Sequence, residues 1–454
     1  MTVQNTVGTG QYGSFFSLFS FSVVFQILLD LGIENFNRRE IARHHDLAGK
    51  YLSNIIPLKF LLGVAYFLIS SGIGYLLGWK ADMIRMLALL LFNQFLANFI
   101  LYFRSTLGGL HLFKTDSIMS VLDRSLVIII CSVLLWGNIS KKPFQIEWFI
   151  YAQTFSYLIS AIVTFFVIKK RVGKIRLSFD RQYYLSILKR SLPYALLILL
   201  MASYLRMDSI LLERILPNGK EQAGIYAHSF RILEILSNYG YLFSILLLPI
   251  FSKMLQLKQS VEELVKLSYL LIIIPTLLIT ISCIFYRQEI IALLYKEQIT
   301  ESSKVFGILI LSLLGICTTY IFGTLLTANG NLRELNIMAG IGVIINVSLN
   351  LILIPRYQVM GSALANLTTQ IYTSIVQILL ATRKFNFTIN YKIISKLAVY
   401  VLILIIAGFI VTNININWYL GFLLLLTFGG SFSIFIRLYN LKSLYRIIRY
   451  EDNV

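Results

Sequence analysis

Residues 190–250 read RSLPYALLILLMASYLRMDSILLERILPNGKEQAGIYAHSFRILEILSNYGYLFSILLLPI. Two apolar runs, each long enough to cross a bilayer, flank a short polar turn at 217–219. The runs carry four charged residues: Arg206, Asp208, Arg231 and Glu234. A charge at bilayer depth costs about 3 kcal/mol on insertion scales, so such side chains face a bundle interior or a watery cavity. The stretch therefore predicts a transmembrane hairpin with a polar seam.

The composition extends this interpretation to the whole chain. Of its 454 residues, 57% are hydrophobic and 13% are charged, and the mean hydropathy is +0.76. A soluble domain cannot hide that much apolar surface, and runs of about twenty residues indicate helices rather than barrel strands. The net charge of +19 comes from basic residues in short connections, which is typical of cytoplasmic loops rather than of nucleic-acid binding. We expect an all-α, polytopic membrane bundle with no nucleic-acid partner.

Thirteen apolar runs are predicted to span the membrane. They cover about 14–32, 58–78, 83–103, 117–137, 147–168, 191–212, 225–250, 267–286, 305–326, 336–354, 360–382, 394–412 and 418–436. Connections alternate in charge, and the basic ones, including 33–57 and 169–190, place the C-terminus in the cytoplasm. With thirteen spans, the N-terminus then lies outside. The two long basic connections are partly amphipathic and are expected on the cytoplasmic membrane surface.

A weak internal repeat indicates duplication. Residues 11–15 (QYGSF) match 222–226 (QAGIY), 211 residues later, and 114–120 (KTDSIMS) match 333–339 (RELNIMA), offset by 219. Both copies cross in the same direction, so the repeat is parallel. A whole span precedes the second copy, but only ten residues precede the first. We expect that the first copy lacks its opening helix through truncation or a late start; the alternative is a true thirteen-span protein.

Motifs for catalysis or cofactor binding are absent from the sequence. It contains no Gly-rich phosphate loop, no His-Glu-x-x-His helix and no local signature of a serine or cysteine nucleophile. The four histidines have no ligand spacing, and the three cysteines lie in apolar runs. We predict a protein that is not an enzyme and has no metal or cofactor. Coupling to a proton or sodium gradient stays open.

Polar groups inside the spans carry the functional prediction. The candidate substrate-binding residues are Lys59, Gln94, Asn98, Arg124, Arg206, Arg231 and Asn238. The planar fork of arginine suits phosphate or pyrophosphate, so the predicted cargo has an anionic head. A duplicated bundle with polar residues near the midplane is typical of alternating access. Asp208 and Glu234 are expected to tune the charge or to carry a coupling proton.

Structural alternatives stand beside each of these roles. Arg206 could pair with Glu234, or Arg231 with Asp208, without any ligand. Amides often join helices by hydrogen bonds, which is the alternative for the following residues: Gln94, Asn98, Asn346, Asn350, Asn366, Gln370 and Gln377. Asp30, near a cytoplasmic end, is interpreted as a helix-end residue rather than a ligand.

Several motifs resemble a known family in order along the chain. They are 8–13 (GTGQYG), 29–32 (LDLG), 37–42 (NRREIA), 192–193 (LP), 212–214 (LER), 224–226 (GIY), 247–251 (LLPIF), 355–357 (PRY) and 361–365 (GSALA). Together they resemble the O-antigen and capsule repeat-unit flippases of the multidrug/oligosaccharidyl-lipid/polysaccharide exporter superfamily. The resemblance implies fourteen helices in two pseudo-symmetric six-helix lobes, a C-terminal helix pair and a V-shaped central cavity.

The resemblance also implies cargo and location. Such proteins move undecaprenyl-pyrophosphate-linked oligosaccharides across the bacterial inner membrane without ATP, for surface polysaccharide synthesis, where polysaccharide polymerases and chain-length proteins act. On this plan, residues 1–168 form the first lobe with five spans and 169–190 a basic cytoplasmic linker. Residues 191–382 form the second lobe, and 383–454 the C-terminal helix pair and basic tail.

Two rival functions remain. A cation-coupled multidrug exporter of the same architecture should have a cavity that favours acidic residues, whereas this chain has the opposite bias. A lipid-linked sugar polymerase or ligase should have a long external loop, which this sequence lacks.

Overall fold

The chain folds almost entirely into helices in its computed structural model, which describes residues 1–137, 143–173, 177–388, 390–414 and 416–438. The earlier helices are α1 (Thr2–Val7), α2 (Thr9–Phe25), η1 (Gln26–Leu29), α3 (Ile33–Arg43), η2 (His45–Leu47), α4 (Ala48–Leu76), α5 (Ala81–Gly109), α6 (Phe113–Trp136), α7 (Ile146–Val172) and α8 (Arg181–Ile215). The later ones are α9 (Gly219–Gln256), α10 (Glu262–Phe285), α11 (Arg287–Leu294), α12 (Ile299–Leu309), α13 (Ser312–Ala328), α14 (Leu332–Tyr357), α15 (Val359–Phe385), α16 (Tyr391–Asn413) and α17 (Trp418–Phe435).

The prediction of thirteen spans is confirmed. Within the described ranges, thirteen helical segments are long and apolar enough to cross a membrane. One of them, Ile299–Ala328, is built from two helices, α12 and α13. Several helices extend beyond their predicted limits, because hydropathy detects only the part inside the hydrocarbon layer. α9, with 38 residues, is about 57 Å long at 1.5 Å per residue, whereas a hydrocarbon core is about 30 Å thick.

The chain divides into two compact units, Met1–Glu213 and Arg214–Val454. The first unit therefore includes the span at 191–212, which the sequence-based plan assigned to the second lobe; the lobe boundaries and the cavity between lobes stay predictions. The predicted linker 169–190 is partly helical, since α7 ends at Val172 and α8 begins at Arg181. Residues 174–176 of that linker and 439–454 of the basic tail lie outside the described residues.

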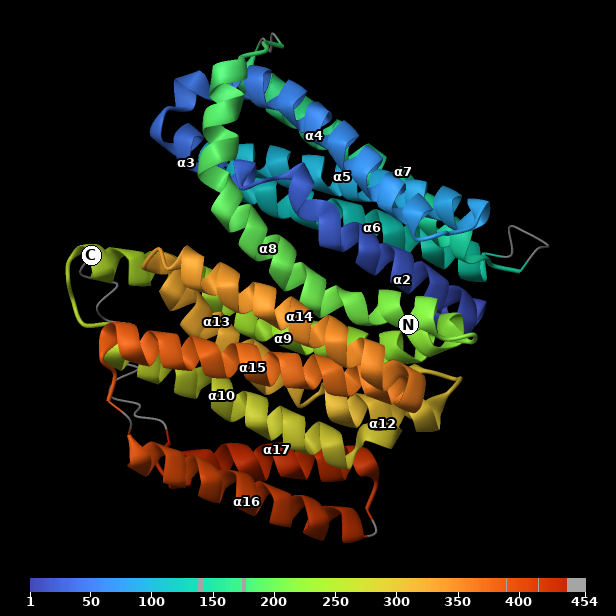
Figure 1. The fold of residues 1–454 in the computed structure, drawn as a ribbon, viewed down its shortest axis with the longest axis vertical. Helices are drawn as coiled ribbons and strands as arrows, with labels where there is room; N and C mark the ends of the chain where they lie inside the picture. Colours follow the sequence, from blue (N-terminus) through green and yellow to red (C-terminus); the bar gives the residue numbers. More distant parts are fainter. Residues whose placement is uncertain (138–142, 174–176, 389, 415, 439–454) are drawn as a thin grey trace. The chain divides into compact units, whose positions relative to one another are not determined.

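Each unit is organised around one central helix. In the first unit, α5 contacts α2, α3, α4, α6 and α7; in the second, α13 contacts α9, α10, α14 and α15. The outer pair α6–α7 of the first unit has its counterpart in α14–α15 of the second. Figure 1 shows these helices running side by side within each unit. The same order of helices making the same contacts supports the duplication predicted from the sequence.

A proline interrupts α4 and fixes the connection between α7 and α8. Pro57 has no N–H, so the carbonyl of Ser53 loses its helical partner. The N–H of Ser178 donates to that carbonyl at 3.0 Å. Nearby, the Tyr184 hydroxyl donates to the carbonyl of Asn54 at 2.8 Å. The segment before α8 is therefore held against α4 by the groups that the proline exposes.

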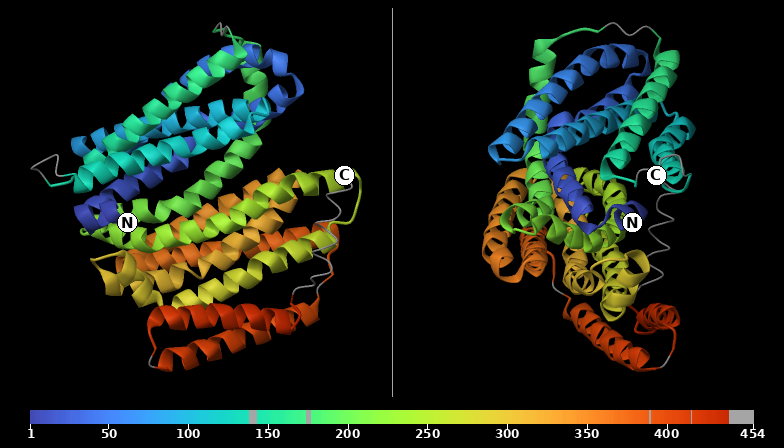
Figure 2. Two further views of the ribbon diagram at one scale, coloured as in Figure 1. Left: turned by 180° about the vertical axis from the view of Figure 1, so that it is seen from behind. Right: turned by 90° about the vertical axis from the view of Figure 1, so that its right-hand side faces the viewer.

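The C-terminal helices form a hairpin. α16 and α17 lie side by side and contact α10 of the same unit (Figure 2). Tyr400 of α16 is fully buried there, with its hydroxyl donating to the carbonyl of Gly429 at 3.3 Å. This arrangement confirms the predicted C-terminal helix pair.

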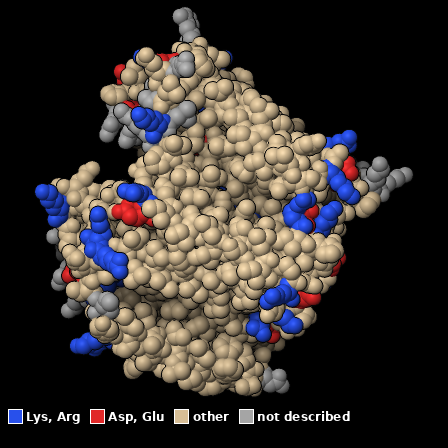
Figure 3. All heavy atoms as spheres, viewed as in Figure 1, with Lys and Arg blue, Asp and Glu red and all other residues tan. Residues whose placement is uncertain are grey.

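Charged side chains avoid the middle of the helices on the visible surface. Figure 3 shows Lys, Arg, Asp and Glu in separate groups, with a wide surface free of these four residue types between them. Many large apolar side chains of the described residues are exposed, including Phe67, Leu68 and Leu402. Such a surface suits lipid tails, where an exposed apolar side chain costs nothing.

Candidate functional site

Asp30 sits in the turn between η1 and α3, where it caps α3. Its Oδ2 accepts a hydrogen bond from the Gly32 N–H at 3.0 Å, and its Oδ1 accepts one from the Glu34 N–H at 3.1 Å. Gly32 has φ 81°, a left-handed conformation that glycine adopts without steric cost and that turns the chain under the helix. The carboxylate thus satisfies N–H groups that have no helical partner. The prediction that Asp30 is a helix-end residue is confirmed.

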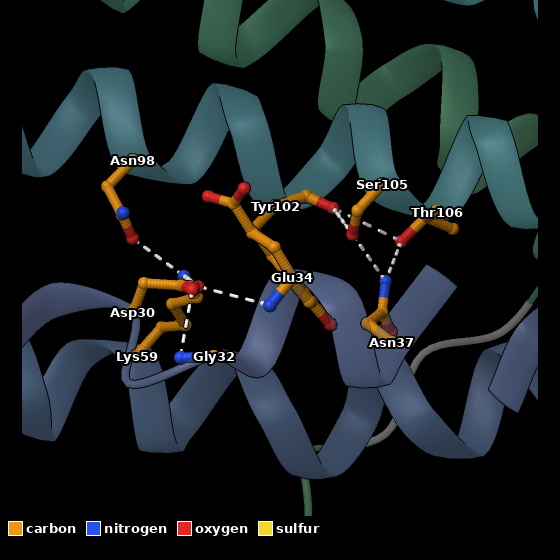
Figure 4. Close-up of polar contacts among 9 residues, drawn as sticks. All are labelled: Asp30, Gly32, Glu34, Asn37, Lys59, Asn98, Tyr102, Ser105 and Thr106. Carbon is orange, nitrogen blue, oxygen red and sulfur yellow. Dashed lines mark hydrogen bonds and ion pairs between the residues drawn. The ribbon is translucent and has the colours of Figure 1, made fainter. Parts of the chain in front are cut away.

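Lys59 is buried beside this cap, on α4. Its side chain is 1% exposed, and Nζ lies 2.9 Å from Asp30 Oδ1, whose own side chain is 18% exposed. Nζ also donates to Asn98 Oδ1 at 2.6 Å and lies 5.4 Å from the ring centroid of Tyr102. Burying an ammonium this deeply requires such compensation. Figure 4 shows the three elements converging on this group.

The α3 helix is fixed to α5 just beyond this cluster. Asn37 is fully buried, and its Nδ2 donates to Ser105 Oγ at 2.8 Å and to Thr106 Oγ1 at 2.9 Å (Figure 4). A Cβ added at Gly109 would lie 2.9 Å from Cβ of Ile41, so only glycine permits this approach. The first predicted cytoplasmic connection is therefore in part a helix packed onto the bundle.

Glu34 is a further member of this cluster, which sequence reasoning missed. Its side chain extends from α3 towards α5, where Tyr102 lies (Figure 4). Burial, and then the neighbouring Asp30 carboxylate, raise the pKa of Glu34 from 4.5 to about 7. The spacing of Asp30 and Glu34, one helical turn apart at the end of a span, is the signal that could have identified the pair. The charged cluster of the first unit comprises Asp30, Glu34, Lys59 and Asn98.

Gln94 and Asn98 both lie buried on α5, one turn apart. Asn98 Oδ1 accepts the hydrogen bond from Lys59 Nζ described above. A neighbouring amide, Asn93, accepts a hydrogen bond from the Thr154 hydroxyl at 2.7 Å and so joins α5 to α7. Two of the amides on α5 therefore make contacts within the first unit, and a role for Gln94 and Asn98 towards substrate stays a prediction.

Arg124 lies exposed halfway along α6. Only 11% of the residues in the apolar stretch of this helix are buried, and the nearby side chains of Val121 and Ile128 are exposed too. A guanidinium on such a face is costly in lipid, which favours a position towards water or an anionic partner. Arg104, by contrast, is neutralised by Asp116 at 2.7 Å, across α5 and α6.

Arg231 and Glu234 face each other on α9 in the second unit. Arg231 Nη1 lies 3.3 Å from Glu234 Oε2, and the two side chains are 29% and 30% exposed. A partly exposed pair three residues apart contributes about 0.2–1 kcal/mol. The guanidinium is therefore oriented by Glu234 without being buried by it.

Arg206 and Asp208 lie on α8, in the first unit. Asp208 is fully buried, whereas Arg206 is half-buried. The pairings considered from the sequence, Arg206 with Glu234 and Arg231 with Asp208, would each join residues of different units and stay predictions.

His228 and Asn238, ten residues apart on α9, lie in different surroundings. Asn238 is exposed, whereas His228 is buried with its ring stacked on Tyr295 at 3.9 Å between centroids. His228 Nδ1 also lies 2.7 Å from Ser302 Oγ. A 38-residue helix passes several environments along one face, so helical periodicity alone does not place its residues together.

The amides of α14 and α15, for which helix joining was the structural alternative, lie inside the second unit. Asn350 Nδ2 donates to the carbonyl of Asn346 at 2.9 Å, and the Ser362 hydroxyl donates to Asn350 Oδ1 at 2.6 Å. Asn366, Gln370 and Gln377 are also buried. This placement fits the helix-joining alternative, because the hydrogen bonds connect one helix to its neighbour.

Two of the hollows formed by the described residues can be compared with the predicted site, and no predicted site residue lines either of them. An apolar one of about 270 Å³ lies between α4 and α5 around Gly63 and Phe95. A polar one of about 150 Å³ lies where α13, α14 and α15 end or begin, and includes Glu334 and Arg383. Within the described residues, no three His, Cys, Asp or Glu are grouped to hold a metal ion.

Comparison with known proteins adds to this picture. A family described as polysaccharide biosynthesis protein matches residues 1–255. The uncharacterized membrane protein MJ1375 of Methanocaldococcus jannaschii is 24% identical over 384 residues, which cover 80% of this chain and 88% of that protein.

Solved structures share the fold. The lipid II flippase MurJ, in an inward closed conformation, superposes with a TM-score of 0.67 at 18% identity, covering 94% of this chain and 97% of its own. An inward-facing multidrug resistance transporter of the MATE family, in the MOP superfamily, has a TM-score of 0.67 at 16% identity, covering 83% and 90%. These neighbours are a flippase and a transporter rather than enzymes.

Proposed function

The chain belongs to the polysaccharide biosynthesis protein family, and on this basis we propose that it translocates a lipid-linked oligosaccharide with an anionic head group. The carrier is undecaprenyl pyrophosphate, and the cargo is an O-antigen or capsule repeat unit. Translocation proceeds by alternating access across the bacterial inner membrane, and polymerase and chain-length proteins act on the product. The C-terminus faces the cytoplasm.

The observation that carries this proposal is the exposure of guanidinium groups within membrane-spanning helices of both units. Arg124 of α6 is exposed, and Arg206 of α8 and Arg231 of α9 are partly exposed. Arginine at bilayer depth is retained where it meets water or an anion. The guanidinium fork binds two phosphate oxygens at once, so a pyrophosphate offers several matching acceptors.

The acidic groups near these arginines fit a supporting role. Glu234 orients Arg231 at 3.3 Å, and Asp208 is buried on α8. Lys59 differs from the arginines, because its ammonium already pairs with Asp30 and donates a hydrogen bond to Asn98 within the first unit. We therefore assign head-group binding to Arg124, Arg206 and Arg231, with Asn238 exposed on the same helix as Arg231.

Substitution of these arginines tests the proposal. Arg231→Ala and Arg124→Ala each remove one charge-assisted contact, worth about 1.5–3 kcal/mol, and should lower translocation about 10- to 100-fold. Translocation is measured in proteoliposomes as the fraction of a fluorescent lipid-linked oligosaccharide protected from an external glycosidase. Cells that carry either variant should lose surface polysaccharide while the protein stays in the membrane.

Arg85→Ala is the matched control, because Arg85 is 83% exposed near the start of α5 and lies 3.9 Å from Asp82. It should translocate at the wild-type rate. Wild-type rates in both test variants would contradict the head-group role. Efflux of cationic dyes by the wild-type protein would instead support the drug-exporter alternative.

A further inference from the structure

We propose that Glu34, with Asp30 and Lys59, forms a proton-binding site that controls the packing of α3 on α5 in the first unit. A role of this site in coupling translocation to a proton gradient rests on the proposed function. Proton binding at the site does not depend on it. Its geometry is a carboxyl pair and one buried ammonium at the start of a helix that is not itself a span.

The charge balance of this site depends on Glu34. Asp30 and Lys59 neutralise each other at 2.9 Å, and Asp30 also caps α3 through the Glu34 N–H. When Glu34 is protonated, the cluster is neutral. When Glu34 is ionised, the cluster holds a second carboxylate, and its charge is disfavoured by burial and by the neighbouring Asp30 carboxylate.

The groups that face Glu34 come from every element around it. Asp30 precedes α3, Lys59 belongs to α4, Arg38 to α3 itself and Arg104 to α5. Arg104 is neutralised by Asp116 of α6. The short helix η2 also contacts α3, and its His45 ring lies 5.2 Å from the ring of His111 rather than in the cluster.

The direction of the pH dependence of stability follows from these neighbours. Burial and Asp30 raise the pKa of Glu34 to about 7, so the carboxyl holds its proton below pH 7 and loses it above. The folded form then binds more protons than the unfolded one, and its stability falls as the pH rises through 7. Proton loss therefore loosens the first turn of α3, while the Asn37 contacts hold the later turns on α5.

Hydrogen–deuterium exchange of 33–43 tests the site in the full chain in nanodiscs, without any cargo. After correction for intrinsic exchange rates, protection of the first turn should fall about tenfold between pH 6 and pH 8 and should level off above about pH 7, where the folded and open forms are both ionised. Glu34→Gln, which stays neutral, should remain protected throughout. Asp30→Asn keeps an acceptor for the cap but removes the charge beside Glu34, so the pH at which protection levels off should move down.

Glu40→Gln on the same helix is the control and should behave as the wild type. Protection that does not change with pH in the wild type, or that falls equally in Glu34→Gln, would overturn the site. Coupling is then measured in proteoliposomes with a pH gradient, where wild-type translocation should depend on pH near 7 and that of Glu34→Gln should not. Identical pH dependence in both overturns the coupling role alone, whereas a wild type that moves no cargo overturns the proposed function and leaves the exchange result standing.

Discussion

α4 of the first unit and α10 of the second each contain one proline, Pro57 and Pro275, which lie 218 residues apart. In both helices, the carbonyl four residues earlier loses its helical partner. Ser53 O accepts from the Ser178 N–H in the first unit, and Leu271 O accepts from the Tyr239 hydroxyl at 3.2 Å in the second. The duplicated units thus keep the same break in the backbone and repair it with different donors.

The side chains that follow the two prolines differ in charge. Lys59 comes two residues after Pro57, and Leu277 two residues after Pro275. Lys59 reaches Asn98 on α5, whereas the Thr276 hydroxyl reaches Sγ of Cys317 on α13 at 3.4 Å. The repeat therefore conserves which helices pack together, while a buried charge is present at this contact in the first unit and replaced by neutral groups in the second.

The largest effect is expected from giving α4 the residue that α10 has. Lys59→Leu leaves the Asp30 carboxylate without its ammonium partner, which should cost about 3–5 kcal/mol of unfolding free energy. The free energy is measured by titrating mixed micelles with denaturing detergent. Lys59→Leu combined with Asp30→Asn should recover most of the loss, because the charge is gone and the cap keeps an acceptor. Equal loss in the single and double variants would show that the ion pair is not what holds this contact.

A medium effect is expected where α13 packs closely against α15 in the second unit. A Cβ added at Gly315 of α13 would lie 2.7 Å from the carbonyl oxygen of Gln370 on α15. Gly315→Ala must therefore separate the two helices, at a cost of about 1–3 kcal/mol. Gly340→Ala is the control, since no atom lies within 4 Å of the added carbon, and its stability should stay within about 1 kcal/mol of the wild type. Similar values for both variants would mean that the central helix is not closely packed.

The smallest effect is expected at the repaired proline breaks. Tyr239→Phe removes the donor to Leu271 O, and Tyr184→Phe removes the donor to Asn54 O. Each should cost about 0.5–1.5 kcal/mol by thermal unfolding in detergent, since one hydrogen bond is lost. Tyr241→Phe, on an exposed tyrosine of α9, should be neutral. Wild-type stability of Tyr239→Phe would show that this hydroxyl does not repair the break at Pro275.

Features that depend on residues close together in the sequence could be predicted without the structure. The thirteen spans, the C-terminal pair and the role of Asp30 follow from runs of apolar residues and from position at a helix end. The partners of Lys59 could not be predicted, since Asp30 and Asn98 are 29 and 39 residues away. Such contacts depend on how α2, α4 and α5 pack, which periodicity does not encode.

The site residues show the same division. Charges within apolar runs made Arg124, Arg206, Arg231 and Lys59 equal candidates, and the sequence could not separate the exposed arginines from the neutralised Lys59. The binding role of the arginines stays a prediction. Glu34 was missed because it stands in a basic connection, where a carboxylate looks solvated. The spacing of four residues from Asp30 was the available signal, whereas the burial of Glu34 follows from the packing of α3 against α5.

During biosynthesis, the ion pair of Asp30 and Lys59 favours insertion of α2 and α4 as one hairpin. A lone lysine in the middle of a segment adds about 3 kcal/mol to the cost of leaving the translocon for lipid. Asp30 is synthesised 29 residues before Lys59, so its carboxylate is available to pair with the lysine when α4 emerges. Asn98 is synthesised later, as part of α5, and also accepts a hydrogen bond from Lys59 Nζ. The Lys59 amine thereby links the membrane insertion of α2, α4 and α5.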